Sequence, residues 1–252
     1  MAKFGHQQKS NNQTLVLYGR HPVCAAIANN NRHIFNIFIT QDNVDEIKKL
    51  CSKVNRGESL IKVVNRNELE KMLPHDAVHQ GFVCQVKELE QYDITDIGVL
   101  AEDKEKCHIL ILDQVTDPQN IGAIIRSCVA FDTLAMVVQD KNSPSESGAM
   151  AKASAGMIEH LPIARVTNLS RAIETLKKNG FWIVGMDGYA SSTIDKVNKN
   201  GKIAIVMGSE GKVMRRQIEE SCDTMVKLPI SEKVESLNVA TAAAIALYEI
   251  NK

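Results

Sequence analysis

Three segments in the second half of the 252-residue chain carry polar side chains that could do chemistry. Each one opens or closes a strand-like apolar run with a cluster of Gly, Pro, Asn, Ser or Glu, and an α/β fold places its ligand contacts at such positions. The segments are 113–126, 205–211, and 228–230 together with 236–239.

The first segment combines a helix start with two candidate catalytic residues. Asp117 and Pro118 are typical of a turn that enters a helix, which places Asn120 in the first helical turn. Arg126 follows further along the same helix, at the edge of its apolar face. Taken singly, both residues would have ordinary structural roles, so a functional interpretation depends on the other two segments.

The second and third segments also end strands and start helices. Gly208 closes an apolar strand, and Glu210 follows on a tight turn before Gly211. Glycine there lets a ligand approach the backbone, and the N–H groups at the next helix start suit an anionic or polar group. Ser236 and Asn238 precede an alanine-rich helix, and each is a candidate N-cap.

Strands and helices alternate regularly after residue 107, which predicts an α/β fold with a largely parallel sheet covered on both faces. The predicted strands are 108–112, 134–138, 181–185, 202–207 and 224–228. The predicted helices are 119–130, 169–178, 214–220 and 239–250. These elements would form one domain over residues 107–252.

The first half of the chain predicts a smaller α/β domain over residues 15–88, after a flexible tail at 1–14. Short apolar runs predict strands at 16–18, 34–39, 60–64 and 82–86, with helices at 22–28 and 44–54 between them. The charged stretch 89–106 is interpreted as a linker, with a possible helix at 94–100.

Composition and charge exclude several classes of protein. Thirty basic and thirty acidic residues cancel, so any phosphate-binding surface must be a local patch. The six cysteines form no Cys-x-x-Cys pair, which favours free thiols in a reducing cytoplasm. No apolar run is long enough for a membrane helix, and the polar N-terminus has no apolar signal-peptide core.

Common nucleotide and metal sites are also excluded. The chain has no Gly-x-Gly-x-x-Gly motif, and the segment 208–212 has too few residues between its glycines for a phosphate-binding loop. His75 and His79 stand one helical turn apart, but no third ligand accompanies them. We therefore expect no metal.

The three segments resemble, in order and spacing, the signature motifs of the SpoU (TrmH) family, which transfers methyl groups from S-adenosylmethionine to ribose 2′-hydroxyls of RNA. The resemblance covers residues 107–252 and implies a deep trefoil knot in this domain. It implies catalytic roles for Asn120, Arg126, Glu210, Ser236 and Asn238, and cofactor contacts by Gly208, Leu228, Ile230 and Leu237. Two residues depart from the family pattern: Val213 and Ala240 stand where glycine and serine are frequent.

A weaker resemblance covers the first domain. Segments 18–23 and 77–81 are similar to those of the subgroup that methylates guanosine in 23S rRNA. This implies a small domain like those of ribosomal proteins, with Arg20, His21 and Arg32 as RNA contacts, and a homodimer formed by the second domain. Two alternatives stay open: methylation of a transfer RNA ribose, and a catalytically silent RNA-binding assembly factor.

Overall fold

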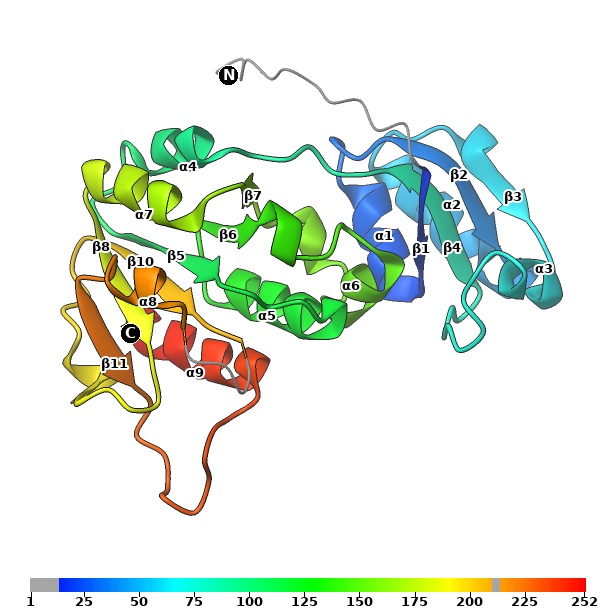
Figure 1. Ribbon diagram of the computed structural model, residues 1–252. Coiled ribbons are helices and arrows are strands. Elements are labelled where there is room, and N and C mark those ends of the chain that lie inside the picture. The colour runs from blue at the N-terminus through cyan, green and yellow to red at the C-terminus, as the bar shows by residue number, and fades with distance from the viewer. Residues whose placement is uncertain (1–13, 210–213) are drawn as a thin grey trace. The chain divides into compact units, whose positions relative to one another are not determined.

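The computed structural model describes residues 14–209 and 214–252, and Figure 1 shows how the chain is folded. The helices are α1 (Arg20–Ala28), α2 (Val44–Lys53), α3 (Arg66–Glu70), α4 (Ile94–Ala101), α5 (Pro118–Ala130), α6 (Gly148–Ala153), α7 (Leu169–Lys178), α8 (Arg216–Glu219) and α9 (Val239–Asn251). The strands are β1 (Thr14–Tyr18), β2 (Ile34–Ile39), β3 (Ile61–Val63), β4 (Phe82–Lys87), β5 (Cys107–Leu112), β6 (Ala135–Gln139), β7 (Ile163–Val166), β8 (Phe181–Met186), β9 (Ser192–Thr193), β10 (Lys202–Met207) and β11 (Thr224–Lys227).

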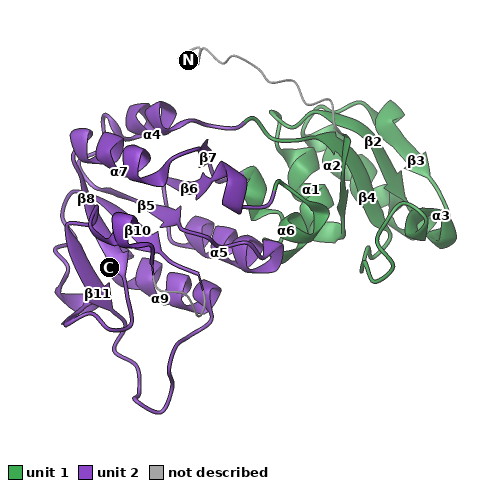
Figure 2. Cartoon of the chain, viewed as in Figure 1, with its two compact units in different colours: residues 1–90, 145–159 green, residues 91–144, 160–252 purple. Residues whose placement is uncertain are grey.

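The chain divides into two compact units (Figure 2). Unit 1 contains residues 1–90 and 145–159, and unit 2 contains residues 91–144 and 160–252. The segment 145–159, which includes α6, lies in sequence between two strands of unit 2 but packs in unit 1, where α6 contacts β1. The sequence pattern did not predict this insertion, because α6 is short and its partners are distant in the chain.

Unit 1 is built on a four-stranded sheet with the strand order β1-β4-β2-β3. The pairs β1–β4 and β4–β2 are antiparallel, and β2–β3 is parallel. Phe38, Leu69 and Val83 form an apolar cluster that joins the sheet to α3. All four strands were predicted, and so were α1 and α2; Pro22 lies in the first turn of α1.

Unit 2 is an α/β unit with a seven-stranded parallel sheet in the order β7-β6-β5-β10-β8-β11-β9. Its strands are almost fully buried runs, as expected for a parallel sheet with both faces covered. One hydrophobic core joins alternate strand residues such as Ile109 and Val137 to α4, α7 and α8. Helices α5 and α9 pack against each other on the opposite side from α4 and α7 (Figure 1).

The predicted parallel α/β fold of the second half is therefore confirmed. Strands β5, β8, β10 and β11 and helices α5, α7 and α9 lie within a residue or two of their predicted bounds. The predicted linker contains α4, whose N-cap Asp93 accepts hydrogen bonds from the backbone of Thr95 and Asp96 at 2.7 and 3.1 Å. Strand β7 (Ile163–Val166) was not predicted.

Candidate active site

The predicted motifs meet at one edge of the parallel sheet. The first motif follows β5, the second follows β10 and the third follows β11, and these strands run in the same direction. Strand β8 lies between β10 and β11 in the sheet, so its carboxyl end belongs to the same edge. Ligands of open α/β sheets bind outside the carboxyl ends of the strands.

The start of α5 positions the two candidate residues of the first motif. Asp117 is the N-cap and its side chain accepts a hydrogen bond from Gln119 N at 3.0 Å, while Pro118 occupies the first helical position. Asn120 is therefore fixed in the first turn. Arg126 is exposed, and its guanidinium forms no ion pair with any residue in 14–209 or 214–252.

The third motif reaches the first through one side-chain amide. Asn238 is the N-cap of α9, and its Oδ1 accepts hydrogen bonds from the backbone N–H groups of Ala240 and Thr241 at 2.9 and 3.3 Å. Its Nδ2 donates a hydrogen bond of 3.0 Å to Oδ1 of Asn120. The predicted N-cap role of Asn238 is thus confirmed, and the same side chain links two motifs that are 118 residues apart.

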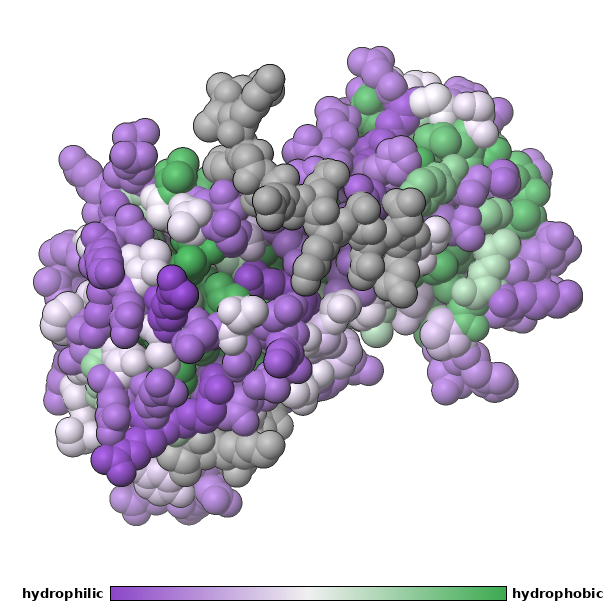
Figure 3. All heavy atoms as spheres, turned by 45° about the horizontal axis from the view of Figure 1, so that its top comes forward, coloured by the Kyte–Doolittle hydropathy of each residue, from purple (hydrophilic) through white to green (hydrophobic). Residues whose placement is uncertain are grey.

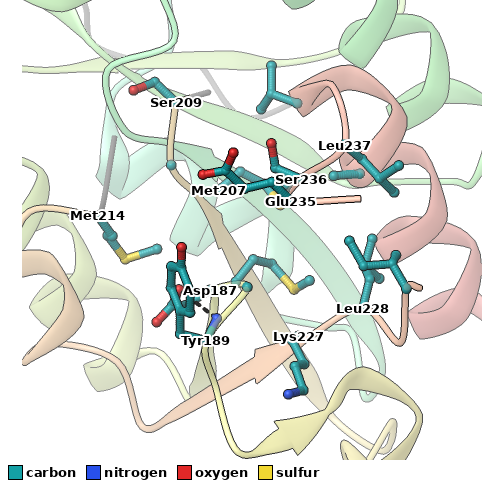
Figure 4. A pocket seen from close by; sticks show the side chains of 16 residues that line it. Asp187, Tyr189, Met207, Ser209, Met214, Lys227, Leu228, Glu235, Ser236 and Leu237 are labelled. Atoms are coloured by element: carbon teal, nitrogen blue, oxygen red, sulfur yellow. Dashed lines mark hydrogen bonds between the residues drawn. The ribbon is translucent and has the colours of Figure 1, made fainter. Parts of the chain in front are cut away.

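A cavity of about 270 Å³ lies at the same edge of the sheet (Figure 4). Its size is near the lower end of the range for small-molecule sites. Five residues named from the sequence line it: Gly208, Leu228, Ile230, Ser236 and Leu237.

The sequence did not point to the other wall of this cavity. The carboxyl end of β8 and the turn after it contribute Met186, Asp187 and Tyr189, and the Asp187 carboxylate accepts a hydrogen bond from Tyr189 N at 3.1 Å. Lys227 and Glu235 add two more charged side chains from the region of the third motif. The rule that parallel strands present their carboxyl ends at one edge would have identified this segment once β8 was placed in the sheet.

The second motif is described only up to Ser209. Gly208 and Ser209 both line the cavity, and Ser209 Oγ is buried without a hydrogen-bond partner among the described residues. Glu210, which the resemblance identified as catalytic, lies outside the described residues, as does Val213. The side chain of Met214 lines the same cavity.

The predicted RNA contacts of unit 1 are of two kinds. Arg20 and His21 are exposed at the start of α1, and Arg20 Nη2 lies 2.8 Å from Glu46 Oε1. That hydrogen bond to Glu46 raises the pKa of Arg20.

Arg32 has a different position, and its prediction as an RNA contact is corrected here. Its side chain is fully buried, with Nη2 at 2.5 Å from Glu146 Oε1 and 2.6 Å from Glu159 Oε1. Nη1 donates to the backbone oxygen of Lys87 at 2.8 Å. The guanidinium neutralises two carboxylates inside unit 1 and is not exposed to RNA.

A further basic side chain accompanies Arg20 in unit 1. Lys152 Nζ donates to Gln80 Oε1 at 3.2 Å, and the same oxygen accepts a hydrogen bond from Arg20 N at 3.3 Å. Gly19 has a φ of 93°, a backbone conformation that favours glycine, and the end of the Lys152 side chain lies close to it: a Cβ atom there would be 2.5 Å from Nζ. Lys152 was not predicted from the sequence, because it belongs to the insertion 145–159.

The two histidines with helical spacing do not form a metal site. His75 Nδ1 lies 3.2 Å from Asp76 Oδ1, whereas His79 is buried and its Nδ1 accepts a hydrogen bond from Gly81 N at 3.1 Å. Burial lowers the pKa of His79. Across the part of the chain that the structure describes, no three His, Cys, Asp or Glu residues are grouped so as to hold a metal ion.

None of the helices in the described ranges combines the length and the hydropathy that a bilayer crossing needs. The face shown in Figure 3 is mainly hydrophilic, with scattered apolar areas.

Comparison with solved structures identifies the same fold. The chain superimposes on the SpoU methyltransferase AviRb from Streptomyces viridochromogenes, solved in complex with AdoMet, with a TM-score of 0.80 at 19% identity, covering 98% of this chain and 93% of that one. The AdoMet-bound rRNA methyltransferase from Sinorhizobium meliloti gives a TM-score of 0.79 at 19% identity, covering 96% and 88% of the two chains.

Sequence comparison adds the family. Escherichia coli 23S rRNA (guanosine-2′-O-)-methyltransferase RlmB is 36% identical over 237 residues, which cover 93% of this chain and 96% of that protein. Bacillus subtilis YacO, a putative TrmH family tRNA/rRNA methyltransferase, is 36% identical over 221 residues, or 87% and 88% of the two chains. Residues 16–92 match the RNA 2′-O ribose methyltransferase substrate binding family, and residues 108–248 match the SpoU rRNA Methylase family. The chain therefore belongs to the SpoU family of S-adenosylmethionine-dependent RNA ribose methyltransferases, as its three motifs predicted.

Proposed function

We propose that this protein methylates the ribose 2′-hydroxyl of a guanosine in 23S rRNA. The observation that carries the proposal is the hydrogen bond between Asn238 and Asn120, which joins the third motif to the first beside the cavity formed by the second and third. The substrate comes from the relatives: RlmB of Escherichia coli carries 23S rRNA guanosine in its name and aligns over 96% of its length.

The cavity suits S-adenosylmethionine. Leu228, Ile230 and Leu237 provide apolar walls for the adenine, and glycine at 208 leaves the backbone accessible. The carboxylates of Asp187 and Glu235 can accept hydrogen bonds from an ammonium group or from ribose hydroxyls, and Ser209 Oγ has its hydrogen-bonding capacity unused among the described residues. When bound, the cofactor supplies an electrophilic methyl group on a sulfonium.

Arg126 is the residue we assign to the substrate hydroxyl. A ribose hydroxyl is a poor nucleophile because it holds its proton tightly, so catalysis consists of alignment and of handling that proton. A guanidinium stays charged in proteins and can bind a phosphate through two hydrogen bonds. Arg126 therefore stabilises the developing alkoxide, and the proton passes to phosphate or water.

The other polar residues orient this arginine and the ribose. Asn120 is held by Asn238, so the helix that carries Arg126 is tied to the third motif. Ser236 lines the cavity and is exposed, which suits a contact with the substrate. Glu210 lies outside the described residues, and we assign it the orienting role that the family resemblance implies.

RNA binding falls to unit 1, which contains residues 16–90 of the segment 16–92 that matches the substrate-binding family. Arg20 and His21 are exposed, and Lys152 lies beside them with no carboxylate partner in the described chain. Burial lowers the pKa of Lys152, which is consistent with an ammonium that lacks a counter-charge. Structured RNA is read largely through shape and phosphate contacts, which such basic side chains provide. Unit 1 would then resemble an RNA-binding ribosomal protein domain.

We also propose that the protein forms a homodimer through unit 2. The second helix of the α5–α9 pair exposes Ile245 and Tyr248, at 41% and 52% of their surface. Two apolar side chains three residues apart on one helix face suit a contact with a second copy. Sedimentation at micromolar concentration should give a dimer, whereas a monomer would contradict this proposal.

We further propose that unit 2 contains a trefoil knot and that the protein is cytoplasmic. The knot is supported by the strand order, in which β10 lies between β5 and β8, and by the packing of α9 against α5. Pulling both ends of a knotted chain should leave it measurably shorter than its full contour length, and complete extension would contradict the knot. A ribosomal RNA substrate would place the protein in the cytoplasm.

The activity is tested by incubating the purified protein with tritiated S-adenosylmethionine and either 23S rRNA or transfer RNA. We expect tritium in 23S rRNA and a ribose-methylated guanosine on mapping. Label in transfer RNA alone would identify the other substrate, which the name of the Bacillus subtilis relative includes. RNA binding without label in either would identify a silent assembly factor.

A further inference from the structure

An ion pair between the buried carboxylate of Asp113 and the partly exposed guanidinium of Arg215 connects two strand ends to the start of α8 in unit 2. It has no part in the chemistry above. Asp113 follows β5 directly and is 1% exposed. Arg215 binds its carboxylate through both nitrogens of one guanidinium edge: Nη2 contacts Oδ1 and Nε lies 3.2 Å from Oδ2. Nη2 also donates to Gln139 Oε1, at the end of β6, at 2.9 Å.

The pair is needed because the carboxylate is buried. A buried charge without a partner is strongly destabilising, and Arg215 is the ion-pair partner that Asp113 has in the described part of the chain. Two parallel hydrogen bonds also fix the orientation of the guanidinium, which a single contact would not. Arg215 is the N-cap of α8, but its side chain makes no capping hydrogen bond. Instead, the side chain contacts Asp113 and Gln139 at the ends of two strands.

The Asp113–Arg215 ion pair lies next to two residues that line the cavity, Met214 and Met207. Met214 immediately precedes Arg215, is 7% exposed, and lines the cavity while packing in the core of unit 2. Met207 also lines the cavity, and its backbone oxygen accepts a hydrogen bond from Asp113 N at 2.8 Å. The Asp113–Arg215 pair therefore fixes the backbone on which both methionine side chains stand.

We propose that Arg215 and Asp113 are positioning residues for cofactor binding, because their ion pair sets the place of Met214 and Met207 in the cavity wall. The inference rests on the proposed function, in which this cavity holds S-adenosylmethionine. It assigns Arg215 no contact with the RNA or the reacting atoms.

The test compares variants of the full-length protein by calorimetric titration with S-adenosylmethionine, thermal melting and steady-state kinetics. Arg215→Gln removes the pair but leaves Asp113 charged, whereas Asp113→Asn with Arg215→Gln removes both charges. Arg215→Lys keeps the charge but loses the two-bond geometry. Arg216→Gln is the matched control, since Arg216 is exposed and its one ion pair within the described residues is with Glu220, the C-cap of α8, at 2.7 Å.

We expect the doubly neutral variant to regain much of the melting temperature lost by Arg215→Gln, because no buried charge is left unpaired. Its dissociation constant for S-adenosylmethionine should remain raised about tenfold, a change of about 1.4 kcal/mol. The dissociation constant of Arg215→Lys for S-adenosylmethionine should lie between those of the wild type and the doubly neutral variant. The KM for RNA should stay within about twofold of wild type in all of these variants.

A doubly neutral variant, or Arg215→Lys, that binds the cofactor as tightly as wild type would overturn the inference and leave the pair a purely structural one. Wild-type protein that binds no S-adenosylmethionine would instead overturn the proposed function. The control Arg216→Gln should match wild type in every measurement.

Discussion

Replacing Arg32 by methionine tests whether this arginine supports the fold of unit 1 or contacts RNA. Methionine keeps an unbranched chain but removes the charge, which leaves the carboxylates of Glu159 and Glu146, 1% and 10% exposed, without their counter-charge. Burial already raises the pKa of Glu146, a shift that Arg32 opposes. The folded state of the variant must therefore protonate these groups or expose them to water.

The size of the effect follows from this burial. Removing one partner of a buried ion pair costs about 3 to 5 kcal/mol. At about 2 to 4 °C per kcal/mol for a chain of this length, the melting temperature should fall by about 6 to 20 °C. Arg32→Met with Glu159→Gln should be more stable than the sum of the two single changes predicts, because the two residues share hydrogen bonds of 2.6 to 3.1 Å.

Arg20→Met is the matched control. Its side chain is 52% exposed and forms one surface ion pair, so its loss should leave the melting temperature nearly unchanged. RNA binding should show the opposite ranking: Arg20→Met weakens it and lowers the slope of affinity against salt, whereas folded Arg32→Met keeps the wild-type slope. An Arg32→Met protein with wild-type stability and weakened RNA binding would refute this reasoning.

Three further changes test the site and the fold. Arg126→Lys should lower kcat at saturating RNA by about 100-fold while cofactor affinity is unchanged, since lysine cannot reproduce the two-bond geometry; near-normal turnover would contradict the role of Arg126. Asn238→Ala should cost about 1 kcal/mol of stability through the lost α9 cap and should also lower kcat. Asn238→Ser keeps a capping oxygen but loses the hydrogen bond to Asn120, so it should recover the stability but not kcat. Burial lowers the pKa of His108, so below about pH 6.5 the unfolded chain binds a proton at this residue more readily than the folded chain does. The free energy of unfolding should therefore fall by up to about 1.4 kcal/mol per pH unit as the pH drops below about 6.5. Denaturant titrations of His108→Gln should show a weaker pH dependence, and the exposed His75→Gln should show the wild-type one.

Much of the fold could be predicted because the signals are local. Strands β5 and β10 are uninterrupted apolar runs that end at polar or glycine residues, and the N-caps Asp117 and Asn238 mark their helices without reference to the rest of the chain. The parallel sheet follows from the alternation of such elements. The positions of Gly208 and Leu237 at one cavity follow in turn from the shared direction of the strands.

What could not be predicted depends on contacts between distant residues. Arg32 appeared to be an exposed basic residue because its partners Glu146 and Glu159 lie 114 and 127 positions away. The bond between Asn120 and Asn238 depends on α9 lying beside α5, which no local pattern encodes. Asp187 was missed because the turn after β8 resembles any polar loop until the neighbours of that strand are known.

The membership of residues 145–159 in unit 1 has a consequence for synthesis on the ribosome. The nascent chain contains Arg32 early, but the glutamates that neutralise it are synthesised only after β5 and β6, the first two strands of unit 2. At about 5 to 20 residues per second, the interval between residues 90 and 159 lasts about 3 to 14 s. Unit 1 cannot complete its interior during that time, so the order of folding does not follow the order of translation.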